Sequence, residues 1–487
     1  MTDTKEPLNL GEKLKPRRTF ELVGAVADEM HRECYVVGGY VRDIIIGRPN
    51  KDIDFVTVGS GIEIAQAVAR HLRGAKVAVY RNYGTAQIHR GTLELEFVGA
   101  RRESYHRESR NPIVEDGTLA DDLARRDFTI NALAVRVNAD GFGEVVDHYD
   151  GIGDIGRRLI RTPLDPDITF SDDPLRMMRA IRFATQLGFD IVPETFAAIR
   201  RNSERIKIIT AERITTELMK IMASPEPSRG WYMLLDSGLL GYFLPELERM
   251  KGIEVVKGRG HKDNFRHTMM VLDGVARASD NVWLRWAALL HDIGKPVTKH
   301  FDPERGWTFH QHNFVGAKMV KSIFARLKMP MGAEMHYVQK LVELHMRPIA
   351  LVEDEVTDSA VRRLINYAED NLADLMILAR ADITSGQEDR RARYLANFDL
   401  VEEKFRTTNA KDLERNRKNP VDGTEIMALF GLSQGPEVGY YAKSLKQAIK
   451  DCEIEDNRPA AFRYLLDLAA ARGVRPLYDP LAEPAQK

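Results

Sequence analysis

The sequence contains little cysteine and no long apolar run. Its two cysteines, Cys34 and Cys452, lie far apart in the chain and give no disulfide framework. Apolar patches are short, such as AALL before His291, and none approaches the length of a membrane span. The N-terminal stretch MTDTKEPLNLGEKLKPRRTF is polar and lacks the apolar core of a signal peptide. We therefore expect a cytoplasmic protein with no membrane partner.

The sequence also lacks an excess of either charge. It has 71 Lys and Arg against 72 Asp and Glu, which gives a net charge of −1. Proteins that bind nucleic acid are often basic overall, because Lys and Arg neutralise phosphates. Any RNA-binding surface must therefore be local. Two basic clusters are candidates, at 101–126 and around Arg415, although an ordinary solvated face explains the second equally well.

No internal repeat or low-complexity tract is visible, which argues against a solenoid. The length of 487 residues is enough for several compact units, each with its own core. Strand and helix signals alternate in the N-terminal part, and helical periodicity dominates after Arg161. We expect an α+β head with a small mixed sheet over 15–160. An all-α body follows, and its expected parts are 161–250, 251–390 and 391–487.

The first candidate site is in VVGGYVRDIIIGRPNKDIDFVTVG. A predicted strand ends at Gly38 and Gly39, and a helix begins near Val41. Glycines let backbone N–H groups approach a phosphate, and a helix N-terminus favours negative charge. Arg42 adds a cationic group that can bind the same phosphates. Two glycines before a helix are a weak signal alone, because a tight turn is the more common meaning.

The pair Asp52 and Asp54 strengthens this interpretation. On a strand, alternation with Ile53 and Phe55 places both carboxylates on one face. Two neighbouring, half-buried aspartates repel each other, and a divalent cation removes that penalty. Mg²⁺ prefers oxygen ligands together with substrate phosphates, so we expect Mg²⁺ here. Glu96 is a candidate third carboxylate, but Glu94 shares its face and competes for the role.

Two further segments are rich in arginine. In DDLARRDFTINALAV, a capped helix with a surface Arg pair is the ordinary explanation. The functional interpretation is that Arg126 binds a triphosphate and Asn131 steadies the nucleotide. In SDDPLRMMRAIRFATQLGF, charged residues recur every three positions and form one helical stripe: Asp173, Arg176, Arg179 and Arg182. An Asp–Arg pair can accept from the amino group of cytosine or adenine and donate to the ring, which would exclude G and U.

In this order, the motifs resemble the class II tRNA nucleotidyltransferase and bacterial poly(A) polymerase family. The matching segments are GGYVRD with DID, RRDFTINA, the DYDGIGDI-type hinge, DDPLRMMRAIRF and ITAERITTELMKI. The resemblance implies a polymerase-β-like head and a helical neck that selects the base. It also implies that ATP and CTP are bound by Gly39, Arg42, Arg126, Asp173, Arg176, Arg179 and Arg182, with metals on Asp52 and Asp54. One departure is visible, because the family usually has Glu-Asp where this chain has Asp172-Asp173.

The body carries a second set of metal-ligand types, spread over more than a hundred residues: His267, His291, Asp292, His312, His345 and Asp382. Imidazoles and carboxylates together suit Ni²⁺, Mn²⁺, Fe²⁺ or Zn²⁺. The segment resembles the HD phosphohydrolase superfamily, whose ligand order is met by His267, His291, Asp292 and Asp382. His312 and His345 match the extra ligands of its two-metal members. Downstream, PVDGTEIMALFGLSQGPEVG resembles the tRNA-binding tail of bacterial CCA-adding enzymes.

Four functions compete at this stage. The leading hypothesis is template-independent addition of CCA to tRNA from CTP and ATP, by a monomer or a homodimer. The second is a poly(A) polymerase or an enzyme that adds only CC or only A. The others are an HD phosphohydrolase with an inactive head and a pure RNA-binding protein, and the intact Asp52 and Asp54 argue against both. The attached HD segment and the length of the segment between Glu96 and Arg126 favour full CCA addition by family analogy.

Overall fold

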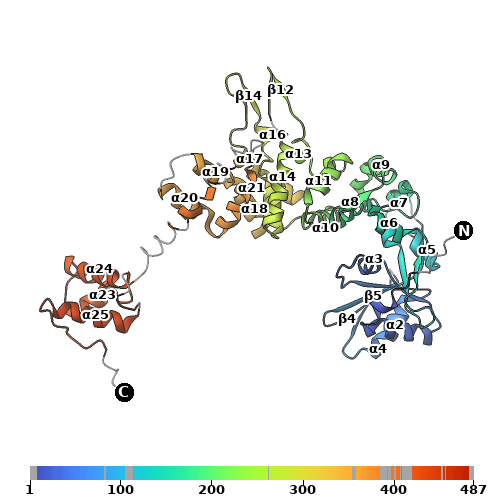
Figure 1. Ribbon diagram of the computed structural model, residues 1–487, viewed down its shortest axis with the longest axis horizontal. Coiled ribbons are helices and arrows are strands. Elements are labelled where there is room, and N and C mark those ends of the chain that lie inside the picture. Colours follow the sequence, from blue (N-terminus) through green and yellow to red (C-terminus); the bar gives the residue numbers. More distant parts are fainter. Residues whose placement is uncertain are drawn as a thin grey trace. The chain divides into compact units, whose positions relative to one another are not determined.

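The computed structural model describes residues 8–481 except for short gaps (Figure 1). The gaps are 82–83, 105–112, 262, 354–357, 384–391, 393–395, 397, 400–401, 406, 408–418, 451–452 and 456. Cys452 and the basic cluster around Arg415 therefore lie outside the described residues. The chain forms two compact units, one of residues 1–355 with 364–398 and one of 356–363 with 399–487. In the described part of the chain, no helix is both long and apolar enough to cross a membrane.

The head is built on a seven-stranded mixed sheet. In spatial order its strands are β3 (Lys76–Tyr80), β4 (Thr85–Arg90), β5 (Leu93–Gly99), β2 (Ile53–Thr57), β1 (Cys34–Val37), β8 (Leu133–Arg136) and β9 (Val145–Asp147). Only the β2–β5 pair is parallel within this sheet. The helices α2 (Arg18–Glu29) and α4 (Gly61–His71) pack against it.

Both faces of the central strands are buried, which explains why β1 reads as the continuous apolar run CYVV. Val36 joins the core beneath α2 and α4, where Phe55 and Phe97 stack with ring centroids 4.9 Å apart. Val37 joins the opposite core. Gly38 then turns the chain into α3 (Gly39–Ile46) with a φ of 72°, a left-handed conformation that favours glycine.

The remaining head elements lie before, between and after the strands of the sheet. They are α1 (Gly11–Leu14), β6 (Arg101–Ser104), β7 (Ile113–Asp116), α5 (Leu119–Ala124), η2 (Thr129–Asn131) and α6 (Gly151–Arg157). Helix α6 corrects the expectation of a flexible glycine-rich hinge at DHYDGIGDIGRR. The N–H groups of Gly151 and Ile152 donate to the two carboxylate oxygens of Asp147, at 2.8 and 2.9 Å, which supports the helix start.

The neck and the following body are helical. The neck helices are α7 (Pro166–Asp172), α8 (Leu175–Leu187), α9 (Pro193–Asn202), η3 (Ser203–Ile208), α10 (Ala211–Met222), α11 (Pro227–Asp236), α12 (Leu240–Phe243) and α13 (Pro245–Glu248), with a short parallel pair of β10 (Leu159–Ile160) and β11 (Asp190–Ile191). The body helices are α14 (Asn264–Ala278), α15 (Val282–Leu290), α16 (Lys295–Thr298), α17 (His312–Arg326), α18 (Ala333–Leu344), α19 (Met346–Glu353), α20 (Asp358–Ala368), η4 (Glu369–Asn371) and α21 (Leu372–Asp382). The predicted fold class, an α+β head followed by a helical chain, is confirmed.

Two β-hairpins in the body were not expected from the sequence. One is β12 (Val255–Val256) with β13 (Arg259–Gly260). The other is β14 (His300–Asp302) with β15 (Gly306–Thr308). Figure 1 shows both projecting beyond the body helices. The strands of these hairpins are only two or three residues long. They are therefore too short to show a clear alternation of apolar and polar residues in the sequence.

The second unit contains α23 (Gly423–Phe430), α24 (Pro436–Lys450) and α25 (Arg458–Ala470) around a separate apolar core. Asp422 and Glu425 form a reciprocal capping box at the start of α23. Arg458 at the start of α25 pairs with Glu425 at 2.6 Å, which ties the two helix ends together.

Arg285 joins neck to body, and its loss should destabilise the first unit. The buried guanidinium donates to the carbonyls of Met222 and Ser224 at 2.7 and 3.0 Å, and to that of Ser279 at 3.1 Å. Arg285→Met would leave these carbonyls without a partner, at a cost of about 2–4 kcal/mol. Chemical denaturation should show this loss, whereas Arg277→Met on the exposed surface should change little. Equal stability of the two variants would contradict the role assigned to Arg285.

Candidate functional site

The strand register brings three carboxylates together near the start of a central strand of the head sheet. Asp54 on β2 stands directly beside Glu96 on the parallel strand β5, and Asp52 precedes β2 by one residue. Gln87 on β4 is opposite Glu96 and donates to it at 3.0 Å. Asp52, Asp54, Glu94 and Glu96 line one pocket of about 100 Å³.

The register also separates the two candidates for the third carboxylate. Glu96 lies level with Asp54, whereas Glu94 lies two residues nearer the start of β5 and is 3.5 Å from His89. Desolvation, Glu96 and Asp52 raise the pKa of Asp54 to about 6, against the opposing charge of Arg126. A divalent cation among these oxygens would reverse that shift, so the donor set fits Mg²⁺.

A continuous chain of polar contacts runs from the acidic pocket to the neck. The backbone N–H of Asp52 donates to Asn50, whose side chain donates to Asp43 at 2.7 Å. Asp43 accepts from Arg42 at 2.9 Å, and Arg42 donates to Asn131 at 2.7 Å. The chain then continues through Asp127 to Arg179 on α8.

Asp127 is the last link between head and neck in this chain. It accepts from Asn131 at 3.0 Å and from Arg179 at 2.7 Å. Burial alone would raise the pKa of Asp127, but Arg179 and Asn131 outweigh it and lower the pKa to about 2. The carboxylate is therefore ionised at neutral pH, and it fixes the orientation of Arg179 relative to the head.

A second pocket, of about 270 Å³, opens where the head meets the neck. Four residues named from the sequence line it: Arg126, Asp173, Arg176 and Arg179. Arg176 donates to the carbonyl of Arg125 at 2.7 Å, and Asp173 lies 3.6 Å from Arg213. Arg125 and Arg213 also line the pocket, and both were missed as candidates. Arg213 lies within ITAERITTELMKI, but its spacing alone did not distinguish it from a surface residue.

Arg126 lies between the two pockets. A Cβ atom at Gly38 would fall 2.8 Å from its Nη1, so only glycine allows the guanidinium to pack against this turn. Arg126 lowers the pKa of Asp54 while it lines the neck pocket. Its other partner is Asp122, a fully buried carboxylate 3.0 Å away. The positive charge is thus held where a triphosphate could span both pockets.

Two predicted nucleotide-binding arginines are buried instead. Arg42 is 7% exposed, and Asp43 and Asn131 bind its guanidinium. Arg182 is also 7% exposed and forms an ion pair of 2.5 Å with Glu217 on α10. Both pack on the ring of Phe183, at 4.9 and 3.8 Å from its centroid. Neither lines the neck pocket, so this geometry gives them a supporting role around the pocket.

The stripe predicted on one helix also needs a correction. Helix α8 carries Arg176, Arg179 and Arg182, but Asp173 precedes it, at the end of α7. One oxygen of Asp173 accepts from the N–H of Leu175 at 3.1 Å. Pro174 separates the two helices, and the turn brings Asp173 to the same pocket as Arg176 and Arg179.

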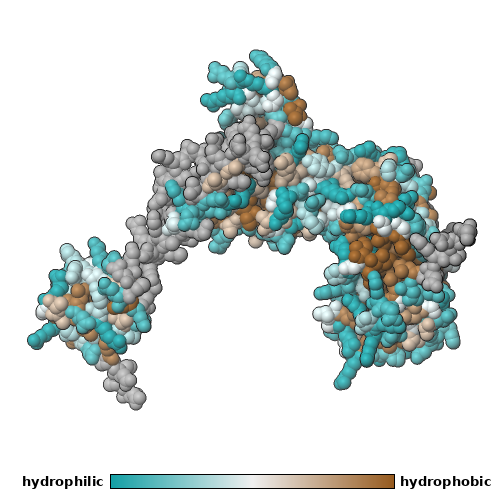
Figure 2. All heavy atoms as spheres, in the orientation of Figure 1, coloured by the Kyte–Doolittle hydropathy of each residue, from teal (hydrophilic) through white to brown (hydrophobic). Residues whose placement is uncertain are grey.

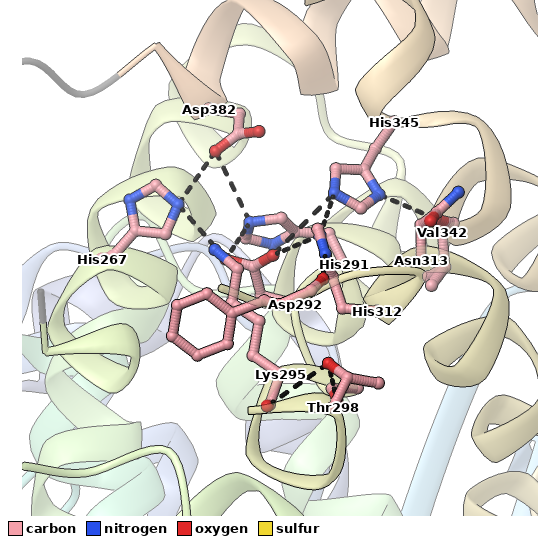
Figure 3. A network of polar contacts seen from close by, with 12 residues as sticks. His267, His291, Asp292, Lys295, Thr298, His312, Asn313, Val342, His345 and Asp382 are labelled. Atoms are coloured by element: carbon pink, nitrogen blue, oxygen red, sulfur yellow. Dashed lines mark hydrogen bonds and ion pairs between the residues drawn. The ribbon is translucent and has the colours of Figure 1, made fainter. Parts of the chain in front are cut away.

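The second site gathers all six predicted ligands in the body (Figure 3). His267 comes from α14, His312 begins α17, and Asp382 ends α21. His291 and Asp292 lie in the turn after α15, which ends at Leu290. His345 follows α18. The six residues thus come from five helices or the turns that follow them, and the other five residues surround Asp292.

Asp292 is the centre of two ligand groups (Figure 3). On one side, its Oδ2 lies 3.2 Å from Nε2 of His291 and 3.5 Å from Nε2 of His267. On the other side, its Oδ1 lies 3.3 Å from Nε2 of His312 and 3.9 Å from Nε2 of His345. Asp382 completes the first group, 2.9 Å from His267. One carboxylate that faces two sets of imidazoles is suited to bridge two metal ions.

The histidine tautomers favour metal binding. The Nδ1 atoms of His291, His312 and His345 each lie 2.7–2.8 Å from a backbone carbonyl. These carbonyls can only accept, so each Nδ1 carries the proton and each Nε2 lone pair faces the centre. Nε2 of His291 is buried and faces the carboxylates of Asp292 and Asp382, at 3.2 and 3.6 Å. A cluster of buried imidazole nitrogens and carboxylate oxygens at these distances fits a divalent metal ion.

The pKa values describe how the centre behaves without metal. Burial lowers the pKa of His291, but Asp292 and Asp382 outweigh it and raise that pKa to about 10. Burial and the charge of His291 lower the pKa of His345 to about 4. One imidazolium therefore offsets the paired carboxylates, a charge that a divalent cation would replace.

Comparison with known proteins matches three parts of the chain to families. Residues 34–161 match the poly A polymerase head domain, residues 188–251 a probable RNA and SrmB-binding site of polymerase A, and residues 264–386 the HD domain. An A-adding tRNA nucleotidyltransferase of Deinococcus radiodurans is 33% identical over 85% of this chain and 90% of its own length. A CC-adding tRNA nucleotidyltransferase of Thermus thermophilus is 30% identical over 86% and 89%.

The chain belongs to the tRNA nucleotidyltransferase and poly(A) polymerase family. The family resemblance predicted from the motifs, with an attached HD domain, is therefore confirmed. Among solved structures, the Thermotoga maritima CCA-adding enzyme complexed with tRNA superposes with a TM-score of 0.60 at 21% identity. It covers 95% of this chain and all of its own, so the fold extends over nearly the whole length.

Proposed function

We propose that this family member adds CCA to the 3′ end of tRNA, with CTP and ATP as substrates. The main support for the proposal is that Arg126 lines the neck pocket and also acts electrostatically on Asp54 in the acidic pocket. The acidic pocket holds Asp52, Asp54 and Glu96, and the neck pocket holds an Asp–Arg set able to recognise a base. Two relatives add A or CC to tRNA, which supports tRNA as the acceptor.

The proposed reaction is a nucleotidyl transfer. The 3′-oxygen of the RNA attacks the α-phosphorus of the nucleotide, its proton is lost, and the bond to the β-phosphate breaks to release pyrophosphate. Bound at Asp52, Asp54 and Glu96, Mg²⁺ ions would lower the pKa of the 3′-hydroxyl and neutralise the leaving group. Arg126 is placed to bind the triphosphate. The glycine turn at Gly38 and Gly39 and the buried Arg42 keep the backbone and Asn131 in position around it.

Base selection is assigned to Asp173 and Arg176. Asp173→Ala should raise incorporation of UTP and GTP relative to CTP by about 5- to 100-fold, because each bidentate base contact contributes roughly 1–3 kcal/mol of discrimination. Single-turnover incorporation with each NTP measures this ratio. Asp190→Ala, an exposed neck carboxylate, is the control and should leave selectivity unchanged. A variant that is slower but keeps its preference for C and A would place base selection elsewhere.

Full CCA addition is distinguished from partial addition by acceptor choice. Purified protein would be given tRNA that lacks CCA, tRNA that ends in C, and tRNA that ends in CC, each with CTP, ATP or both. Sequencing of the 3′ ends should show CCA on all three acceptors. Extension that stops after CC, or that begins only on tRNA ending in CC, would assign the partial activities. Long runs of A would assign a poly(A) polymerase.

The HD centre supports a second, hydrolytic function. We propose that it is a metal-dependent phosphohydrolase that removes phosphate from damaged RNA ends. The observation in favour is that Asp292 lies between two groups of imidazoles, with His267 and His291 on one side and His312 and His345 on the other, and that Asp382 adds a second carboxylate to the first group. The ion held there would be Ni²⁺, Mn²⁺, Fe²⁺ or Zn²⁺, because imidazole suits these metals better than Mg²⁺.

A further inference from the structure

The two unexpected hairpins form one projecting lobe, defined here as residues 252–261 and 295–311. Three contacts join the hairpins. The indole N–H of Trp307 donates to the carbonyl of Arg259 at 3.1 Å, and Arg259 donates to the carbonyl of Glu304 at 2.5 Å. Lys299 pairs with Glu254 at 2.8 Å. The lobe is therefore a cross-linked unit rather than two independent loops.

Aromatic rings and cations alternate on this lobe. The ring of Trp307 lies 5.2 Å from Phe301 and 5.5 Å from His261, and Nζ of Lys299 lies 4.5 Å from its centroid. His261 also lies 6.0 Å from Phe309. All four rings keep part of their surface exposed. A small structural core would explain the ring contacts, but it does not explain the cation placed over the indole face.

The lobe is connected directly to the proposed metal centre. Its second segment, 295–311, begins with α16 three residues after Asp292 and ends next to His312, so both of its ends are adjacent to proposed metal ligands. Nζ of Lys295 pairs with Asp292 at 2.5 Å and lies 5.7 Å from the ring of Phe309. The carbonyl of Phe309 accepts from Nδ1 of His312 at 2.8 Å. A ligand stacked on the lobe would thus have its phosphate directed toward the centre.

The chemistry favours single-stranded RNA as the ligand. The lobe carries five Lys and Arg against three Asp and Glu, together with three histidines. Figure 2 shows that its surface is mainly hydrophilic, with a narrow hydrophobic edge, and its exposed large apolar residues are Ile253, Val255 and Val297. Aromatic faces with nearby cations bind unpaired bases and their phosphates without sequence preference.

We propose that this lobe binds the terminal unpaired nucleotide of an RNA 3′ end and presents its phosphate to the HD centre. The proposal rests on the phosphohydrolase function proposed above and names its substrate class. Trp307 would stack on the base, and Lys299 and Lys295 would lie along the backbone toward Asp292. Specificity for RNA ends over small phosphate esters would then come from the lobe, and the ligand cluster would perform hydrolysis on either substrate.

The test compares two substrates in the full chain loaded with Ni²⁺ or Mn²⁺. One is a short single-stranded RNA that ends in a 2′,3′-cyclic phosphate or a 3′-phosphate. The other is p-nitrophenyl phosphate, which has no nucleobase. Trp307→Ala should raise KM for the RNA about tenfold, in line with the loss of one stacked base, and should leave the small ester unchanged. Trp307→Phe keeps a ring and should retain most of the affinity, which separates stacking from misfolding.

The possible results separate RNA binding by the lobe from phosphate hydrolysis at the HD centre. If the wild-type protein hydrolyses both substrates and Trp307→Ala treats both normally, the lobe is not the RNA platform and the phosphohydrolase stands. If the wild-type protein hydrolyses neither substrate, the proposed phosphohydrolase activity is refuted. Photocrosslinking then tests RNA binding by the lobe independently. An RNA with 3′-terminal 4-thiouridine should crosslink to residues 295–311. Crosslinks confined to the neck or to the second unit, as expected if the lobe serves a protein partner, would overturn the proposal.

Discussion

Asp54→Ala should abolish nucleotide incorporation, with a loss of about a thousandfold or more, and leave tRNA binding nearly unchanged. The reason is that Asp54 lies between Asp52 and Glu96, so its removal disrupts the proposed oxygen donor set for Mg²⁺. Single-turnover incorporation and tRNA binding by filter retention measure the two properties. Asp52→Ala should behave in the same way. Asp140→Ala, an exposed acid of the head, is the control.

The stability of the same variant gives an independent check. Because the pKa of Asp54 is raised to about 6, its ionised form is disfavoured in the folded, metal-free protein. This cost is absent below the ordinary carboxyl pKa near 4 and is complete above about pH 6. In EDTA at pH 7.5, Asp54→Asn should therefore raise the Tm, and at pH 4 the difference should vanish. Near-normal turnover of the variant, or a lower Tm in EDTA, would contradict the site.

The second large effect is expected at the HD centre. Asp292→Ala removes the carboxylate that faces both imidazole groups, so the purified protein should lose its bound transition metal and all hydrolysis of 2′,3′-cyclic phosphate. His291→Ala together with Asp292→Ala should give the same result. Addition of nucleotides to tRNA should persist in both, because the acidic pocket of the head is a separate site. Elemental analysis and the two activity assays measure this separation.

A matched variant makes the HD experiment interpretable. Asp370→Ala changes an exposed acid of the same domain and should keep both metal and hydrolysis. The wild-type protein must be purified without chelator and then assayed with Ni²⁺, Mn²⁺, Fe²⁺ and Zn²⁺ in turn. Wild-type protein with no bound metal and no hydrolysis with any of these ions would refute the proposed phosphohydrolase and leave the HD domain with a structural role.

Local sequence patterns determined the general features of this protein. The run CYVVGG predicts a buried strand and a glycine turn because both depend on neighbouring residues alone. The alternation around Asp52 and Asp54 predicts a shared strand face for the same reason. The histidine and aspartate set of the HD domain was found by the order of its motifs, and the structure brings all six residues together. The fold class followed from where strand signals stop.

The tertiary structure decided which side chains meet. That Glu96 lies level with Asp54 follows from the register between β2 and β5, which no residue spacing reveals. The sequence predicts Arg42 as a phosphate ligand and Arg182 as part of a base-reading stripe, and only the structure shows that Asn131 and Glu217 contact them from distant segments. A helical period predicts which residues share a face and not what that face contacts. The same limit hid the role of Arg213 and the lobe around Trp307, since each depends on packing between elements far apart in the chain.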